Sequence, residues 1–200
     1  MYTLLIIIVT AVISIAGFSS SNLIDKLILW PRRMDNPTQY YRLISSGFIH
    51  ADWGHLFFNM LTLYFFGSII EQQFAIQDMG LLYIVFYLSA ILVSSLPSFI
   101  KNRNNYYYRS LGASGGVAAV LFATVYFDPW SKIFLMFIPI GIPSIIFAVL
   151  YLVYSAYMSK RGGGNVNHDA HFWGSVYGFL IAFLLDPTHN QFLQQITQRF

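Results

Sequence analysis

Residues 110–127 read SLGASGGVAAVLFATVYF, a stretch of 18 residues without a charged side chain. Five further windows also lack Asp, Glu, Lys and Arg: residues 1–24, 53–70, 79–100, 133–159 and 170–185. The 11 basic and 8 acidic side chains of the 200-residue chain all lie between these windows. Charged residues make up 10% of the chain, against about 25% in a soluble globular domain, and the mean hydropathy is +0.58. The pattern argues against a soluble enzyme, a disordered chain and a nucleic-acid-binding domain.

Apolar windows of this length predict membrane-spanning helices, which need roughly 20 mainly apolar residues. Lipid offers the backbone no hydrogen bonds, so a spanning segment has to satisfy its own, as a helix does. The sequence predicts an all-α, polytopic membrane protein: one integral membrane domain over residues 1–200, with six transmembrane helices at about 2–18, 55–74, 80–100, 112–127, 143–158 and 170–185. The long connection 19–53 is expected to have structure of its own.

The remaining composition says little about partners. The net charge is +3 and the pI near 9.1, but the basic residues lie in loops, so we expect a lipid bilayer and no nucleic acid. The chain has no cysteine, which excludes disulfides, thiol nucleophiles and thiolate metal sites. Residues 1–21 are apolar without a basic leading segment and are interpreted as a retained span, although Ala16-Gly17 leaves a signal peptide as an alternative.

Polar residues at span level are costly, so they are functional candidates. Three groups lie at the starts of the second, fourth and sixth spans: His50, His55 and Asn59; Ser114; and His168 and His171. Consecutive spans run in opposite directions, so these three starts face the same side of the membrane. The three groups therefore share one depth and are expected to converge.

The chemistry available to such a group is acyl transfer. Ser114 at a helix start has unpaired backbone N–H groups beside it, which can stabilise an oxyanion. A histidine within hydrogen-bond reach can take the serine proton and return it to the leaving amine. Asn59 lies one helical turn after His55, and both side chains can donate to the oxyanion. Glycines allow the helices to approach closely: Gly112, Gly115 and Gly116 beside the serine, and Gly174 and Gly178 one turn beyond His171.

Each feature also has a purely structural interpretation. A serine among glycines is usually a small packing residue, and a GxxxG pair alone means only helix contact. Several histidines on one face suggest a metal site, but the spacing of His50 and His55 does not place both rings on one helical face, and HExxH is absent. We expect no metal site and no cofactor.

Four stretches resemble the motifs of the rhomboid intramembrane serine proteases, of the compact bacterial six-helix type. They are His50–Asn59 for HxxxxHxxxN, Gly112–Gly115 for GxSG, Ala170–Gly174 followed by Gly178 for AHxxG with a trailing GxxxG, and Tyr41-Arg42 for the Trp-Arg pair of the first loop. They occur in the family's order, from about Tyr40 to Gly178. Any one motif is weak, but all of them in register are a specific signal.

The resemblance implies a serine endopeptidase with Ser114 as nucleophile and His171 as general base. The Ser114 N–H, His55 and Asn59 would form the oxyanion hole. His50 would give structural support by tying the first loop to the start of the second span. Arg42 would stabilise the first loop, and Glu71 would make a polar contact near the far end of the second span. The substrate would be a transmembrane helix of another membrane protein, entering near the second and fifth spans. It would be cut near the membrane face, where a helix unwinds easily.

Three departures from the family pattern matter. Tyr41 replaces Trp. Ala118 stands where many members place an aromatic that packs on the catalytic histidine, so Phe172, Trp173 or another residue would hold His171. An inside N-terminus puts nine basic residues outside and two inside, against the positive-inside rule. The resemblance implies a bacterial plasma membrane with the catalytic face outward, and we follow it.

Two other functions compete with the protease. A catalytically idle relative would bind membrane helices as a chaperone or adaptor, but such relatives typically lose the serine, histidine and asparagine that this chain retains. A small transporter or channel is disfavoured, because the polar groups lie on one face and no charge lies within the spans.

Overall fold

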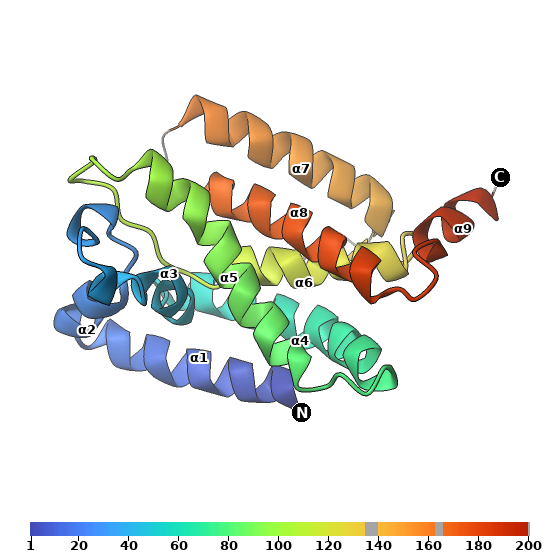
Figure 1. Cartoon of the computed structure of the whole chain (residues 1–200), viewed down its shortest axis with the longest axis horizontal. Helices are drawn as coiled ribbons and strands as arrows, with labels where there is room; N and C mark the ends of the chain where they lie inside the picture. Colours follow the sequence, from blue (N-terminus) through green and yellow to red (C-terminus); the bar gives the residue numbers. More distant parts are fainter. Residues whose placement is uncertain (135–139, 163–165, 200) are drawn as a thin grey trace.

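The computed structural model describes residues 1–134, 140–162 and 166–199. The helices and strands follow in this order: α1 (Tyr2–Phe18), α2 (Ser21–Leu27), η1 (Pro31–Arg33), η2 (Pro37–Gln39), α3 (Arg42–Ser45), η3 (Ser46–Phe48), α4 (Trp53–Ile76), α5 (Leu82–Lys101), α6 (Ser114–Phe127), β1 (Lys132–Phe134), β2 (Gly141–Pro143), α7 (Ser144–Arg161), α8 (His168–Leu185) and α9 (Gln191–Thr197). Figure 1 shows the long helices as one bundle, with α1 along one side and α7 along the other.

The long helices alternate in direction, as the counting of spans predicts. In Figure 1, α4, α6 and α8 run one way and α1, α5 and α7 run the other. The starts of α4, α6 and α8 therefore lie at the same end of the bundle. The short helices α2 and α3 of the first loop lie at that end too.

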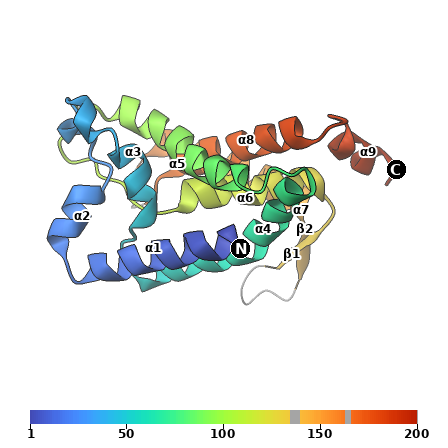
Figure 2. The same cartoon turned by 60° about the horizontal axis from the view of Figure 1, so that its bottom comes forward.

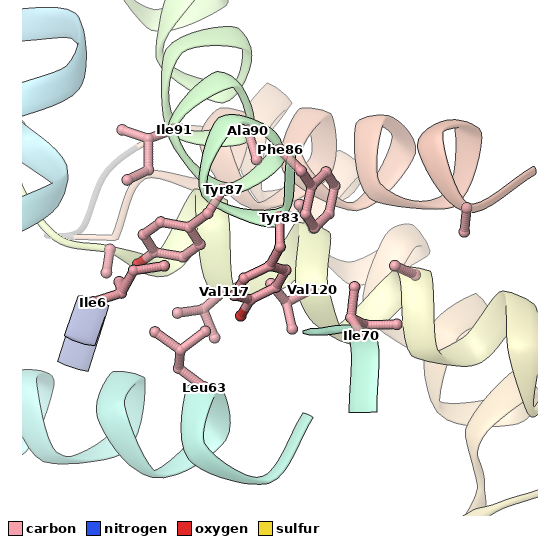
Figure 3. Close-up of a cluster of buried hydrophobic side chains, with 14 of the residues drawn as sticks. Ile6, Leu63, Ile70, Tyr83, Phe86, Tyr87, Ala90, Ile91, Val117 and Val120 are labelled. Atoms are coloured by element: carbon pink, nitrogen blue, oxygen red, sulfur yellow. The ribbon is translucent and has the colours of Figure 1, made fainter. Parts of the chain in front are cut away.

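Helix α6 forms the centre of the bundle. Every residue from Gly115 to Phe127 is buried. In Figure 3, Val117 and Val120 of α6 lie between Leu63 of α4 and the buried rings of Tyr83 and Tyr87 of α5. Because α6 is packed on all sides, its first residue, Ser114, has a fixed position relative to the surrounding helices.

Helices α6 and α8 touch through their backbones. A Cβ added at Gly174 would overlap the carbonyl oxygen of Gly115, and one added at Gly178 would overlap that of Ala119. Only glycine leaves room for this approach. The contact brings the first turn of α8 beside the first turn of α6.

The outward faces of the bundle are apolar. Large side chains that are about half exposed or more line the outer sides of α1 and α7, among them Leu4, Ile8 and Val12 of α1 and Ile146, Leu150 and Val153 of α7. A monomeric soluble protein rarely exposes such continuous apolar surface. The faces fit contact with lipid.

The helices differ in how well they match a bilayer. Among the described residues, α4 and α5 are both long and apolar enough to cross a membrane, while α1 and α6 are apolar but shorter. Helices α7 and α8 have 18 residues each, but polar or charged side chains occupy one end of each, such as Lys160 and Arg161 in α7. The number of spans thus remains a prediction.

The all-α prediction misses one small element. Strands β1 and β2 form an antiparallel hairpin in which Lys132 pairs with Pro143 and Phe134 with Gly141 (Figure 2). The hairpin follows α6 directly and leads into α7. Pro129 and Pro143 disfavour a continuous helix there, and strands of three residues are too short for an alternating pattern to be recognised in the sequence.

The first loop is folded around a buried arginine. Arg42 is 4% exposed, and its guanidinium donates to the carbonyl oxygens of Asp25 (2.7 Å) and Ile28 (3.0 Å) and to the side chain of Gln39 (2.9 Å). Three acceptors on separate parts of the loop are thereby joined by one charged group, and such charge-assisted bonds are the stronger ones.

Candidate active site

Ser114 follows a tight turn that only glycine adopts easily. Gly112 has φ +118°, a region that L side chains rarely occupy. A Cβ on Gly112 would lie 2.7 Å from Nε2 of His55, so the imidazole of His55 packs directly against this turn. The turn places the ring of His55 close to the start of α6 and thus to Ser114.

The first loop holds the segment that precedes Ser114. Leu29 and Ser110 exchange two backbone hydrogen bonds of 3.0 Å, and the N–H of Gly112 donates to the carbonyl of Ser46 at 2.9 Å. These bonds explain why the loop lies at the end of the bundle where α6 begins. The loop is therefore part of the scaffold of the serine.

His50 completes this scaffold. Its Nε2 accepts from the backbone N–H of Ala113 at 3.2 Å, so Nδ1 carries the proton and faces the hydroxyl of Ser14 at 2.8 Å; that hydroxyl in turn donates to the carbonyl of Phe48. His50 thus ties the first loop to α1 and to the residue before Ser114. The ring of His50 also meets that of His55 in the first turn of α4 edge-on, with centroids 4.9 Å apart, so His50 contacts the start of α4 as well.

His50 makes the fold sensitive to acid. Burial lowers the pKa of its imidazole from 6.5 to about 3, so below pH 6.5 an unfolded chain takes up a proton that the folded chain does not. We expect this group to lower the free energy of unfolding by roughly 2 kcal/mol between pH 6.5 and pH 5. Denaturation in detergent across that range should show a shallower pH dependence for His50→Gln; equal slopes for the two proteins would contradict this assignment.

His171 lies in the first turn of α8. Asn167 caps that helix: its Oδ1 accepts from the N–H of Ala170 at 3.0 Å and from the hydroxyl of Ser98 at 2.9 Å, and its Nδ2 donates to Ser110 at 3.0 Å. Asn167 therefore links α8 to α5 and to the segment before Ser114. The sequence analysis did not single out Asn167, although an Asn just before an apolar helix is a recognisable cap signal.

The ring of His171 stacks on Tyr151 of α7. The centroids lie 6.0 Å apart and the planes are inclined by 22°; His168 meets the same imidazole edge-on, at 5.9 Å. Phe172 and Trp173, the two residues named as candidates to hold His171, instead contact each other. Nothing in the sequence distinguishes Tyr151 from the other aromatic residues of its helix.

The predicted site residues meet in one cavity of about 680 Å³. Those that line it are Ser114, His171, His55, Asn59, Gly112 and Gly115. Ser114 and His171 are each partly accessible from it. No hydrogen bond joins the Ser114 hydroxyl to the His171 ring in the described part of the chain. Catalytic hydrogen bonds are often long in the absence of substrate.

The amide of Asn59 is buried and partly engaged. Its Nδ2 donates to the carbonyl of His55 in the same helix at 2.9 Å, which leaves one N–H for another acceptor. The side chain occupies the wall of the cavity on the α4 side, one turn below the ring of His55.

The other predicted supports lie outside the cavity lining. Gly174 and Gly178 hold α8 against α6, and Arg42 holds the first loop. Glu71 lies in the last two turns of α4, where its carboxylate accepts from the backbone N–H groups of Tyr2 (2.7 Å) and Thr3 (2.9 Å). A carboxylate at this position suits the positive end of the α1 dipole. Glu71 thus makes a polar contact, and its partner is α1.

These features define a class of protein. It is a helical bundle with apolar outer faces and a partly open cavity at one end, where a serine, a histidine and amide donors lie at helix starts. The described part of the chain holds no group of three or more metal-binding side chains.

The comparisons agree with this class. The Rhomboid domain family matches residues 37–187, so the chain belongs to the rhomboid family of integral membrane proteins. It is 30% identical over 148 residues to RHOMBOID-like protein 12, mitochondrial, of Arabidopsis thaliana, covering 68% of this chain and 43% of that protein. It is 28% identical over 148 residues to Rhomboid protease GluP of Bacillus subtilis, covering 74% and 26%. Rhomboid protein 1, mitochondrial, of Saccharomyces cerevisiae is 27% identical over 154 residues, with 76% and 43% covered. The chain thus spans less than half the length of each of these relatives.

Proposed function

We propose that this chain is an intramembrane serine endopeptidase that cleaves transmembrane helices of other membrane proteins near the membrane face. One observation carries the proposal: Ser114, His171, His55 and Asn59, from three helices far apart in sequence, line a single cavity. One relative, GluP, is named a protease. The reaction at this site is acyl transfer by a serine–histidine dyad.

In the first step the Ser114 hydroxyl oxygen attacks the carbonyl carbon of the scissile peptide bond, and its proton passes to the His171 imidazole. The tetrahedral intermediate collapses, the C–N bond breaks, and the imidazolium gives the proton to the leaving amine. The acyl group stays on Ser114. Water then attacks this ester with His171 again as the base, which releases the new carboxylate and restores the hydroxyl.

The negative charge on the carbonyl oxygen needs donors that are in place beforehand. The backbone N–H of Ser114 at the start of α6, the ring of His55 and the remaining amide N–H of Asn59 are the donors in this part of the cavity. Removing one such donor typically costs about 10²–10³ in kcat.

The substrate helix reaches the cavity from the bilayer. The lining includes Phe58 of α4 and Phe147 of α7, so an entry between these two helices leads to Ser114. A peptide bond inside an intact helix is shielded, so the substrate has to unwind locally before attack. We place the protein in a bacterial plasma membrane with this end outward; the bacterial relative supports that placement, while other relatives are named mitochondrial or chloroplastic.

A second candidate function is that of an idle relative that binds membrane helices without cutting them. The observation that favours it is that several relatives are named only RHOMBOID-like proteins, without the word protease. An organofluorophosphonate separates the two functions, because only an activated serine reacts with it at an appreciable rate.

The direct test is cleavage of tagged single-span proteins in proteoliposomes, by the wild type and by Ser114→Ala. We expect the wild type to release a fragment cut near the membrane boundary and the variant to release none, because the nucleophile is gone. A variant that unfolds like the wild type and still produces the fragment would refute the assignment.

A further inference from the structure

We propose that Tyr151 of α7 positions the general base. Its ring holds the His171 imidazole in the orientation in which the imidazole can accept the proton of the Ser114 hydroxyl. This inference rests on the proposed function. The observation behind it is the stacked contact between the two rings, with 6.0 Å between centroids and 22° between planes. Offset stacking at this separation is a favoured aromatic geometry.

The imidazole of His171 depends on ring contacts for its orientation. In the described residues no hydrogen bond reaches either of its ring nitrogens; only its backbone is bonded, with the N–H donating to Asn167 and the carbonyl accepting from Ser175. A general base usually has a hydrogen-bonded group that fixes its ring. Among the described residues, the imidazole contacts two rings: it stacks on the face of Tyr151 and meets His168 edge-on.

Tyr151 is itself fixed by aromatic neighbours. Its ring stacks on Phe147, one turn earlier in α7, with centroids 5.6 Å apart, and it lies 5.8 Å from the ring of Phe122 of α6. The row Phe147, Tyr151 and His171 therefore runs along one wall of the cavity. Because Phe147 and Phe122 hold the ring of Tyr151, that ring can in turn restrict the orientation of the His171 imidazole.

Helix α6 has no aromatic ring one turn after Ser114. Ala118 of α6 lies one turn after Ser114 and lines the same cavity with only a methyl group. Because α6 offers no ring at this position, the support of His171 comes from a different helix, α7. The position of the general base is thereby coupled to the position of α7.

The experiment compares Tyr151→Leu, Tyr151→Phe and a control, Tyr157→Leu, in the full-length protein. Tyr157 lies on the same helix but is 59% exposed. We expect Tyr151→Leu to lower kcat about fivefold to tenfold with KM within about twofold, since stacked rings contribute about 0.5–1.5 kcal/mol. Tyr151→Phe keeps the ring and should retain most of the wild-type kcat, and Tyr157→Leu should match the wild type.

A spectroscopic measurement tests the contact without any substrate. In protein labelled with ¹³C-histidine, the ring current of Tyr151 should shift the His171 ring protons upfield, with the signals assigned through His171→Gln. The shift should persist in Tyr151→Phe and Tyr157→Leu and disappear in Tyr151→Leu. An unchanged His171 signal in Tyr151→Leu overturns the proposal.

The outcomes separate this inference from the proposed function. If the wild type cleaves, Ser114→Ala does not, and Tyr151→Leu matches the wild type in kcat, the protease stands and the role of Tyr151 is refuted. A rise in KM with unchanged kcat also refutes it, because that result assigns Tyr151 to substrate binding. If the wild type neither cleaves nor reacts with a fluorophosphonate, the proposed function fails, and the positioning role fails with it.

Discussion

Replacing His171 with Gln is expected to lower the rate of substrate cleavage at least about 10⁴-fold, since the dyad loses the group that takes and returns the serine proton. Gln fills a similar volume and cannot act as a base at neutral pH. The Ser114→Ala/His171→Gln double variant should be no slower than either single variant. The two residues act as a unit, so removing one of them already removes the contribution of both. The measurement is initial-rate cleavage in proteoliposomes.

The matched control is His168→Gln. His168 lies one helical turn from His171, with ring centroids 5.9 Å apart, but it is 7% exposed and does not line the cavity. We expect this variant to keep at least about a tenth of the wild-type rate. Equal losses from both substitutions would mean that the first turn of α8 matters only for folding, and the assignment of the base would be wrong.

Replacing Gly178 with Ala should strongly destabilise the folded protein. The added methyl would overlap the backbone carbonyl of Ala119, and a backbone atom at the centre of the bundle cannot move aside as a flexible side chain can. We expect the free energy of unfolding to fall by at least about 3 kcal/mol, which corresponds to a fall in Tm of about 10 °C for a chain of this size.

Gly17→Ala provides the control for that prediction. Gly17 is also helical and buried, but a Cβ there would meet only Cγ1 of Ile24, at 3.5 Å, an ordinary contact. Alanine is the better helix former, so this variant should be as stable as the wild type or slightly more stable. If thermal unfolding in detergent ranks the two variants equally, close approach of α6 and α8 is not what requires glycine at 178.

The sequence predicts the helices and their convergence because both follow from simple constraints. In a bilayer, a long window without charges satisfies its backbone hydrogen bonds most simply as a helix. Alternating direction then places the starts of α4, α6 and α8 at one end of the bundle. The cavity shared by Ser114, His171, His55 and Asn59 confirms that convergence. Gly174 and Gly178 were also identifiable, since small residues four apart mark a face where helices approach closely.

Other parts of the site depend on contacts that no local pattern encodes. The partners of His50 are Ser14 and the backbone of Ala113, which lie 36 and 63 residues away in the chain. Tyr151 contacts His171 because of the rotation of α7 about its axis, and that rotation is set by packing against the rest of the bundle. The hairpin of β1 and β2 is too short for its alternation to stand out from a proline-containing loop.

The most direct test of the central claim is labelling of Ser114 by a fluorophosphonate in membranes that contain the intact protein, with the modified residue identified by peptide mapping. A single adduct on Ser114, absent in Ser114→Ala, greatly reduced in His171→Gln and retained in His168→Gln, is the predicted result. Absence of an adduct on the folded wild type, or an adduct that forms equally fast in His171→Gln, would contradict a serine activated by His171.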